Sequence, residues 1–300
     1  MYNSPLATLK SINAKFAKGL AVTPISQMQD AYETVDSNGN TEKYIIFDNF
    51  GYIKEWLDEI SFEGLKDYEL EIRNKDWQFG IMVSRNTIED AKDTNTVDID
   101  RQVRTAVQQW TGFPDELIND LLTAGASTPA FDKSNLFATS RPNLQGKGGT
   151  INNIVTGTGT TLAQITADLT SARAAMKGFK DRNNKPFNKE SAFTVICPPQ
   201  LEDVFLRLQT ADLITLSGST QSNIFKGTFN FVTNVYQDIT NNDWFLFNNK
   251  AAFKPFIYQK RRAPIFEMND DHKRKFVEYF STARMAAGPG NPTAIVKIDN

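Results

Sequence analysis

The stretch DIDRQVRTAVQQWTGFPDELINDLLTAG, residues 98–125, predicts one long helix with a kink. Asp98 and Asp100 suit its first turn, because carboxylates are favourable at a helix N-terminus, and Gly125 suits its end. Pro114 has no amide hydrogen to donate, so the helix must bend or restart there. One face is apolar at helical spacing on both sides of the proline, and it consists of Ile99, Val103, Ala106, Trp110, Leu117, Ile118, Leu121 and Leu122.

The segments around this helix mix strands and helices without regular alternation. Thr161 and Gln164 form a capping-box pair that opens a second helix, and residues 200–212 predict a third. Apolar and alternating runs predict strands in the later part of the chain, at residues 191–197, 229–237, 243–248, 251–268, 274–289 and 294–298. Because no βαβ order repeats, the sequence indicates an α+β fold rather than a doubly wound sheet.

An alternating pattern ahead of the long helix predicts a β-hairpin over residues 68–83, with Asn74-Lys75-Asp76 as its turn. Its apolar face consists of Tyr68, Leu70, Ile72, Trp77, Phe79, Ile81 and Val83. Such a face either packs on its own domain or projects and packs on a neighbouring chain. The pattern itself leaves both interpretations open.

Residues 1–43 differ in composition from the rest, because no acidic residue precedes Asp30. Apolar residues at helical spacing, with lysines between them, predict a short amphipathic helix on an arm rather than in a core; the apolar residues are Leu6, Leu9, Ile12 and Phe16. A mitochondrial-type presequence is the competing interpretation, but only three lysines and no arginine precede Asp30.

Composition excludes several classes of function. The 300 residues carry 33 Lys and Arg against 35 Asp and Glu, whereas nucleic-acid binders usually have a basic excess. The 22 phenylalanines favour extensive subunit interfaces. Cys197, the one cysteine, follows an apolar run and is expected to be a buried structural thiol. The N-terminus lacks the apolar core of a signal peptide and no apolar run is long enough to span a membrane, so we expect a protein of the reducing cytoplasm with no membrane partner.

No sequence motif indicates catalytic chemistry. The stretch QGKGGT, residues 145–150, does not fit a phosphate loop, and one histidine cannot build a two-histidine metal site. We expect no catalytic, cofactor or metal site. His272 lies in a segment with eight charged residues, namely Lys260, Arg261, Arg262, Asp270, Asp271, Lys273, Arg274 and Lys275. They form either a phosphate-binding patch or a charged sheet end, which is solvated or matched to charges on another subunit.

The order of several short stretches resembles the major capsid proteins of tailed phages, in particular the Mu-like prophage major head subunit family. The matching stretches run in order over most of residues 44–290, and they are YIKEW (52–56), NKDW (74–77), SRNTIED (84–90), PDELINDLLTAG (114–125), LFATSRPNL (136–144) and YFSTARMAAG (279–288). Arg141 departs from the family pattern, in which histidine stands at this position.

This resemblance implies an HK97-type capsid fold and gives the segments roles. Residues 1–43 are expected to form the N-terminal arm and residues 44–90 the extended E-loop with its base. The peripheral domain takes residues 91–159, with the spine helix, and the return strands of residues 249–300. The axial domain takes residues 160–248. Inter-subunit contacts are expected from the arm residues above, from the charged residues, and from the E-loop side chains Trp56, Tyr68, Leu70, Ile72, Lys75, Trp77 and Phe79.

The function implied is a non-enzymatic capsid subunit that assembles as pentamers and hexamers, in the host cytoplasm and then the virion. A separate scaffolding protein and a portal are expected partners, and the shell encloses DNA without sequence-specific binding. Because residue 1 is Met and few residues precede the E-loop, we expect no cleaved scaffolding segment; we also expect no Lys–Asn crosslinks. The alternatives are an encapsulin-like compartment and an enzyme that binds a phosphorylated substrate.

Overall fold

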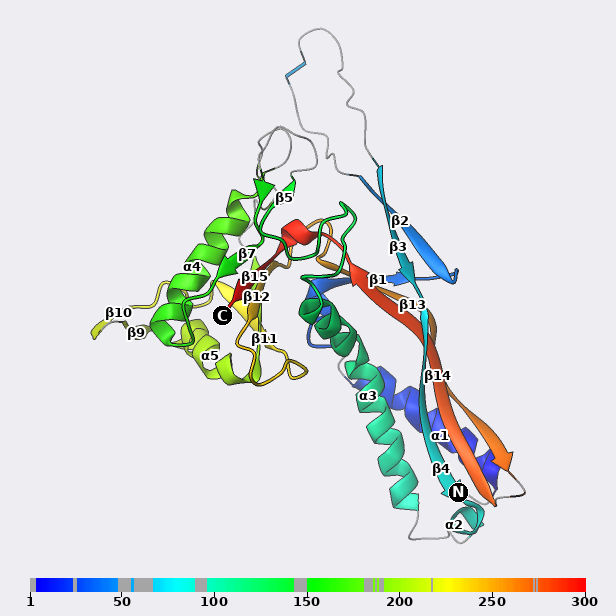
Figure 1. Ribbon diagram of the computed structural model, residues 1–300. Helices are drawn as coiled ribbons and strands as arrows, with labels where there is room; N and C mark the ends of the chain where they lie inside the picture. Colours follow the sequence, from blue (N-terminus) through cyan, green and yellow to red (C-terminus); the bar gives the residue numbers. More distant parts are fainter. Residues whose placement is uncertain are drawn as a thin grey trace.

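A computed structural model describes residues 4–23, 26–47, 55–56, 67–89, 96–142, 150–180, 186, 188, 192–216, 218–271, 273 and 275–300. Two units lie side by side in this part of the chain (Figure 1). The first is a long four-stranded sheet with helices along one face, and the second is a five-stranded sheet with two helices. The fold is therefore α+β, as the sequence predicts.

The first sheet is built on a long antiparallel hairpin of β13 (Phe256–Asp271) and β14 (Phe276–Pro289). β4 (Lys75–Ser84) pairs antiparallel with β14, and β1 (Tyr32–Asp36) pairs parallel with the first part of β13. The two long strands predicted near the end of the chain are confirmed. Pro264 falls beyond the end of β1, where the β13–β14 register is irregular, so its missing amide hydrogen leaves no ladder bond unmade.

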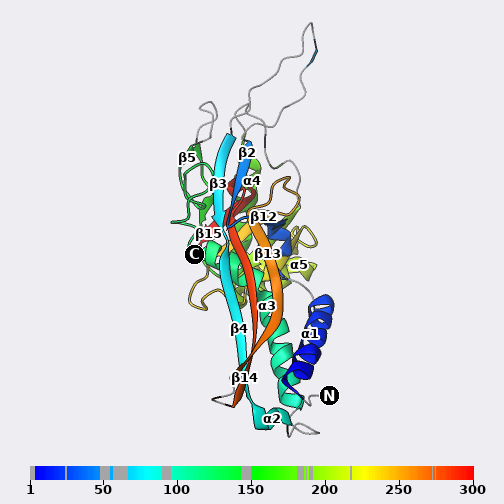
Figure 2. The same ribbon diagram turned by 90° about the vertical axis from the view of Figure 1, so that its right-hand side faces the viewer.

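Two helices cover one face of this sheet, α1 (Pro5–Val22) and α3 (Thr96–Thr123), as Figure 2 shows. Ser4 caps α1 by accepting a hydrogen bond from the Ala7 amide, and Pro5 suits the first turn. Two short helices complete the unit, η1 (Gln29–Ala31) before β1 and α2 (Arg85–Glu89) after β4. The predicted apolar stripe of α3 lies in a core with α1, β13 and β14.

The helix α3 continues through Pro114 without a restart. Two carbonyls in the turn before the proline accept hydrogen bonds from groups outside the helix. The Thr111 carbonyl accepts from the Ser26 amide at 3.4 Å, and the Gly112 carbonyl accepts from the Tyr236 hydroxyl at 3.2 Å. A Cβ on Gly112 would lie 2.7 Å from that hydroxyl oxygen. The proline turn is therefore where two distant segments dock on α3.

The predicted turn at residues 74–76 is wrong. β3 (Asp67–Arg73) pairs with β2 (Thr41–Phe47), whereas β4 pairs with β14, so the chain stays extended as it passes from one sheet to the other. Asn74 is buried at the crossing and donates to the Ser37 hydroxyl at 2.7 Å and to the Gly39 carbonyl at 3.0 Å. A polar triplet that looks like a turn is instead an extended crossing, held by the buried and hydrogen-bonded Asn74.

The second unit contains the mixed sheet β11-β8-β12-β15-β7. Two helices pack on one face of it, α4 (Leu162–Gly178) with the predicted capping box and α5 (Glu202–Thr210). Its strands are β7 (Ile154–Thr156), β8 (Phe193–Cys197), β11 (Phe229–Thr233), β12 (Trp244–Asn248) and β15 (Ile295–Asp299). The remaining elements are β5 (Arg141–Pro142), β6 (Thr150–Ile151), η2 (Pro199–Leu201), β9 (Leu213–Leu216), β10 (Ser219–Ser222) and η3 (Pro292–Ala294).

The two units share one apolar core. Alternate residues of β12 face opposite sides, so Trp244 packs towards α5 and Phe245 packs towards the first unit. Phe137, from the loop after α3, stacks on Phe245 with ring centroids 5.4 Å apart. The expectation that residues 249–300 return wholly to the first unit does not hold for β15, which pairs between β12 and β7.

The prediction that α1 stands apart from a core is also wrong. Ile12 and Phe16 are 0% and 2% exposed, and the Phe16 ring meets Phe266 of β13 edge-on at 4.9 Å. Asn13 exchanges two hydrogen bonds with the backbone of Phe266, at 3.0 and 3.1 Å, where β1 no longer covers the edge of β13. Leu6 alone of the predicted arm contacts is largely exposed, at 53%, and Leu9 is partly buried. The helix therefore covers its own subunit's sheet.

Replacing Phe16 by alanine is expected to lower the free energy of unfolding by about 3–5 kcal/mol, because it empties a buried aromatic site. The matched control is Leu6→Ala on the same helix, for which we expect about 0.5 kcal/mol because that side chain is exposed. Urea denaturation of both variants measures the difference. Equal, small losses would mean that α1 does not belong to the core.

Candidate assembly surfaces

The β2–β3 pair projects beyond the first sheet and is rooted by buried polar contacts (Figure 1). Gln259 of β13 is 0% exposed and donates to the Ile72 carbonyl at 3.1 Å and to the Asn74 side chain at 2.9 Å. Its own amide oxygen accepts from the Tyr44 hydroxyl at 2.9 Å. Burial raises the pKa of Tyr44 to about 12, which keeps this hydroxyl a donor. One side chain therefore fixes both strands of the pair to the sheet below.

The predicted E-loop side chains divide between this root and the sheet. Leu70 and Ile72 are buried against Ile257 and Ala286 at the base of the pair. Gly288 of β14 leaves room there, because a Cβ would meet the Ile72 side chain at 2.4 Å. These two residues anchor the pair within the subunit, whereas Trp56, beyond the pair, is 74% exposed.

Trp77 and Phe79 lie on β4 rather than on the projecting pair. Trp77 packs edge-on against Phe113 of α3 at 4.8 Å and donates from its indole nitrogen to the Met285 carbonyl at 3.0 Å. Phe79 faces the same core and meets Phe266 at 6.3 Å. Lys75 starts β4 and is exposed. Their alternation is that of a core-facing strand, and Tyr68 similarly contacts Phe131 of its own chain, at 5.9 Å.

The face of the first sheet that the helices do not cover carries apolar side chains. Met82 is 63% exposed, Ile265 is 53% exposed and Phe276 is 37% exposed. Gly80 lies opposite Phe280 in the β4–β14 ladder, and a Cβ there would meet only Phe280, at 3.8 Å. We call this the outer sheet face. A glycine within a strand, among exposed apolar residues, suits the close approach of another chain.

The eight charged residues do not converge on one site. β13 and β14 do form the predicted hairpin, but Lys260 pairs with Met285 and Asp271 pairs with Phe276. At about 3.3 Å per residue, roughly 36 Å separates Lys260 from Asp271 along β13. A single phosphate patch is therefore excluded.

The residues near the hairpin turn belong to its charged end. Asp270 accepts from the Arg85 guanidinium at 2.5 Å. Lys273 and Lys275 are exposed, whereas His272 and Arg274 lie outside the described residues. In the first half of β13, far from the turn, Arg261 is exposed and Arg262 donates to the Thr282 hydroxyl at 2.9 Å.

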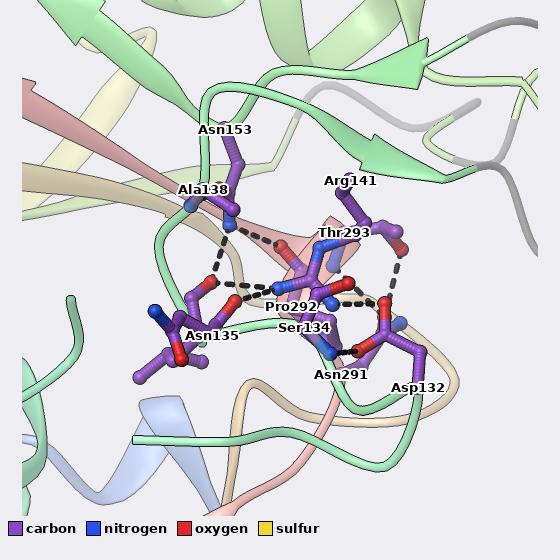
Figure 3. Close-up of polar contacts among 10 residues, drawn as sticks. Asp132, Ser134, Asn135, Ala138, Arg141, Asn153, Asn291, Pro292 and Thr293 are labelled. Carbon is purple, nitrogen blue, oxygen red and sulfur yellow. Dashed lines mark hydrogen bonds and ion pairs between the residues drawn. The ribbon is translucent and has the colours of Figure 1, made fainter. Parts of the chain in front are cut away.

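A buried ion pair holds the segment that joins the units (Figure 3). Arg141 and Asp132 have side chains only 2% and 1% exposed and are in direct contact. Arg141 also donates to the carbonyls of Asn135 and Leu136. Burial lowers the pKa of Arg141, and the Asp132 charge acts in the opposite direction. Arg141 therefore holds this junction together through buried polar contacts.

Asn153 extends this network to the end of the chain, as Figure 3 also shows. Its amide donates to the carbonyls of Leu136 at 2.7 Å and Pro292 at 3.0 Å, and its oxygen accepts from the Ala138 amide at 2.8 Å. Asn188 reaches the neighbouring Thr293 carbonyl at 3.0 Å. Hydrogen bonds therefore join three segments of the chain that lie between the units, around Leu136, Asn153 and Pro292.

A second buried carboxylate anchors the segment after α1. Asp115, directly after the proline of α3, accepts from the amides of Gln27 at 2.8 Å and Met28 at 3.0 Å and from the Ser26 hydroxyl. Its actual role, to hold a segment almost ninety residues away, has no signal in the local sequence.

Cys197 is buried within β8, as predicted. Burial raises the pKa of its thiol to about 12. A thiol with so high a pKa is almost entirely protonated at neutral pH, and it is therefore no nucleophile. Within the described ranges, no group of three metal-ligating side chains occurs, and no helix is long and apolar enough to cross a membrane.

Several apolar residues of the second unit are exposed, and no sequence pattern predicts their exposure. Ile224, beside the β9–β10 pair, is 76% exposed, and Ile239, in the loop before β12, is 75% exposed. Leu213 and Val235 are 61% and 65% exposed. Each lies in a short polar loop or strand, where neither period nor run length distinguishes a surface residue from a core residue.

The arrangement of a projecting strand pair, a long helix on a long hairpin and a second mixed sheet defines an HK97-type capsid fold. The chain superposes with a TM-score of 0.53 on the procapsid protein of bacteriophage JBD30, at 18% identity over 99% of this chain and 76% of that one. It superposes with a TM-score of 0.58 on the virus-like particle from Pyrococcus furiosus, at 11% identity over 97% and 98% of the two chains.

Sequence comparison identifies the family within that fold. Residues 6–166 and 230–292 match the family "Mu-like prophage major head subunit gpT", and the chain belongs to this family. It is 30% identical over 150 residues to the major capsid protein of Escherichia phage Mu. That match spans 49% of this chain and 48%, about half, of the curated relative. The family is one of head subunits.

Replacing Asp132 by alanine is expected to cost about 3–5 kcal/mol of unfolding free energy, because Arg141 then remains buried without its partner. The double variant Asp132→Leu/Arg141→Met is the control, since it removes both charges at once. We expect it to be more stable than Asp132→Ala in thermal and urea unfolding. A double variant as unstable as the sum of both single ones would contradict the ion-pair explanation.

Proposed function

We propose that the chain is the major capsid subunit of a tailed phage or prophage and assembles as pentamers and hexamers into an icosahedral shell. The proposal rests on the family match of the chain together with the surfaces that the subunit exposes. The family is one of head subunits, and the subunit exposes both a projecting strand pair and an apolar sheet face. A shell of identical copies supplies a partner for each.

In the proposed contact, the β2–β3 pair of one copy lies on the outer sheet face of another. Ile45 of β2 is 62% exposed and supplies an apolar side chain, and Met82 and Ile265 supply the complementary surface. The buried root at Gln259 holds the pair in a fixed direction, which lowers the entropy cost of docking. Trp56 is placed to contact the neighbour beyond the pair.

The remaining roles follow from that of the subunit. Residues 44–90 act as E-loop and base, residues 91–159 and the β13–β14 hairpin act as the peripheral domain, and residues 160–248 with β15 act as the axial domain. A scaffolding protein and a portal are the proposed assembly partners, DNA is enclosed without sequence-specific binding, and assembly takes place in the host cytoplasm. No covalent crosslinks are proposed. The encapsulin-like alternative shares the fold but is not favoured by the head-subunit family match.

Electron microscopy of the full-length chain, expressed with and without its candidate scaffolding protein, tests the function. We expect shells, tubes or capsomer rings, because the exposed apolar faces need partners. A uniform monomer in sedimentation, even with the scaffold present, would contradict the proposal. A small fixed oligomer together with activity on a phosphorylated substrate would support the enzyme alternative instead.

The charged hairpin end gives a second test. Reversing Lys273, Arg274 and Lys275 to glutamate is expected to reduce shell yield at least tenfold, because these side chains are proposed to face charges on a neighbouring copy. Unfolding midpoints should be unchanged, since the two described lysines are exposed. Replacement of the same three residues by arginine or lysine, which keeps the charge, is the matched control. Normal shell yield in the glutamate variant would exclude the inter-subunit role.

A further inference from the structure

One edge of the first sheet has no covering strand in the described part of the chain. β4 is ten residues long and pairs with β14 alone, and Figure 2 shows it at the free side of the sheet. From Gln78 to Ser84 the strand has no charge, no proline and no irregularity in its ladder, although such features usually protect an edge from pairing with another chain. β4 therefore presents an unprotected edge.

The even-numbered residues of β4 direct their backbone groups to this edge. The Arg85 amide donates to the Lys275 carbonyl at 3.0 Å, and this pair continues the β4–β14 register. Bonded and non-bonded pairs alternate in an antiparallel ladder, so the odd-numbered residues of β4 bond to β14. No residue within the described ranges hydrogen-bonds to the backbone groups that point away from β14. In the uncharged part of the strand these groups belong to Gln78, Gly80, Met82 and Ser84.

A groove of about 400 Å³ follows the same edge, between β4 and the first turns of α3. Residues 81–84 of β4 line it, together with Thr87 of α2 and Ile99 and Gln102 of α3. A strand added at this edge would bond to the β4 backbone and set alternate side chains against the wall formed by Ile81, Val83 and Ile99. Backbone bonds combined with a side-chain groove are the usual arrangement where a strand binds at a sheet edge.

The edge is complementary to itself in one antiparallel register. When Ile81 of two copies face each other, Met82 of each copy lies opposite Gly80 of the other, and Gln78 lies opposite Ser84. The Met82 side chain is 63% exposed, and it thereby meets a residue at which an added Cβ would have its nearest contact only at 3.8 Å. A slip of two residues would oppose either two glycines or two methionines, which leaves a gap or crowds the pair. No charged residue lies within the overlap from Gln78 to Ser84.

We infer that β4 pairs antiparallel with β4 of a second copy of this chain, so that two four-stranded sheets join into one about a two-fold axis. The inference rests on the proposed function and deepens it by naming a contact that the β2–β3 pair does not make. A two-fold pairing uses the open edge of both copies at once and closes on itself. Its axis is perpendicular to the sheet, so both outer sheet faces lie on the same side, as copies in one shell wall require. Both faces stay free to receive the β2–β3 pairs of other copies.

The test uses the full-length chain with cysteines at one opposed pair, Gln78→Cys/Ser84→Cys. Within a chain the two positions lie roughly 20 Å apart, at about 3.3 Å per residue, which is too far for a disulfide. Across the pairing they lie about 5.5 Å apart, which a disulfide can span. The native Cys197 is buried. After oxidation with copper phenanthroline, we expect at least tenfold more disulfide-linked dimer on non-reducing gels than from either single variant, in which the cysteines of two copies remain far apart.

A proline at Met82 tests the same edge without a crosslink. The Met82 amide points away from β14, so Met82→Pro breaks no ladder bond within the subunit but removes a donor from the pairing. Met82→Thr is the matched control, because it also removes the apolar side chain and keeps the amide. We expect the shell yield in electron microscopy to be at least fivefold lower for the proline variant than for the threonine variant, with similar unfolding midpoints.

Shells that form without disulfide-linked dimers in the double cysteine variant would overturn the inference and leave the capsid function standing. A proline variant that assembles as well as the threonine variant would overturn it too. Loss of shells on Met82→Pro without dimers in the cysteine variant would mean that a strand of another protein occupies the edge, which also excludes self-pairing. Dimers that need both cysteines, in a chain that forms no shells, would support the inference and count against the capsid function.

Discussion

The antiparallel pairing of β13 with β14 is the constraint on which the rest of the molecule depends. Both edges of this hairpin are used, since β4 pairs along β14 and β1 along the start of β13. One face is covered by α1 and α3, and where β1 ends, Asn13 takes its place at the backbone of Phe266. The far end of the hairpin leads, through η3, directly into β15 of the second sheet. A slip of one residue would expose the buried alternate residues of β14, so every other element is fixed relative to this register.

Buried polar side chains decide how segments leave that framework. Gln259 and Asn74 are hydrogen-bonded to each other where the chain crosses between sheets, and Arg141 and Asp132 form an ion pair where it passes between units. An unsatisfied polar group in such places would cost free energy, so each network permits one geometry of the chain around it. The β2–β3 pair and the second unit are consequently held in fixed directions, which is what a subunit that must dock on copies of itself requires.

Local sequence was informative where one element's own period decides its environment. The long helix at residues 98–125, the capping box at Thr161, the core strand ending at Cys197 and the hairpin before Pro289 are all visible in the sequence. The interpretation of Asn74-Lys75-Asp76 as a turn failed because a buried crossing and a tight turn use the same residue types. The sequence predicts that Lys260 and Lys275 belong to one charged cluster because they are close in the chain. The rise of about 3.3 Å per residue along a strand keeps them far apart.

The sequence by itself determined the α+β class, the positions of most helices and strands, and the family, because periodicity, capping and the order of short matches are properties of neighbouring residues. Only the tertiary structure decided that α1 belongs to the core, that β3 and β4 pair in different sheets, and that β15 joins the second sheet. The sequence pattern of an amphipathic helix or strand predicts that it has an apolar face, but it does not predict which surface will cover that face. That choice depends on the packing of residues far apart in the chain, such as Phe16 on Phe266 and Asp115 on Met28, and is made when the whole core assembles.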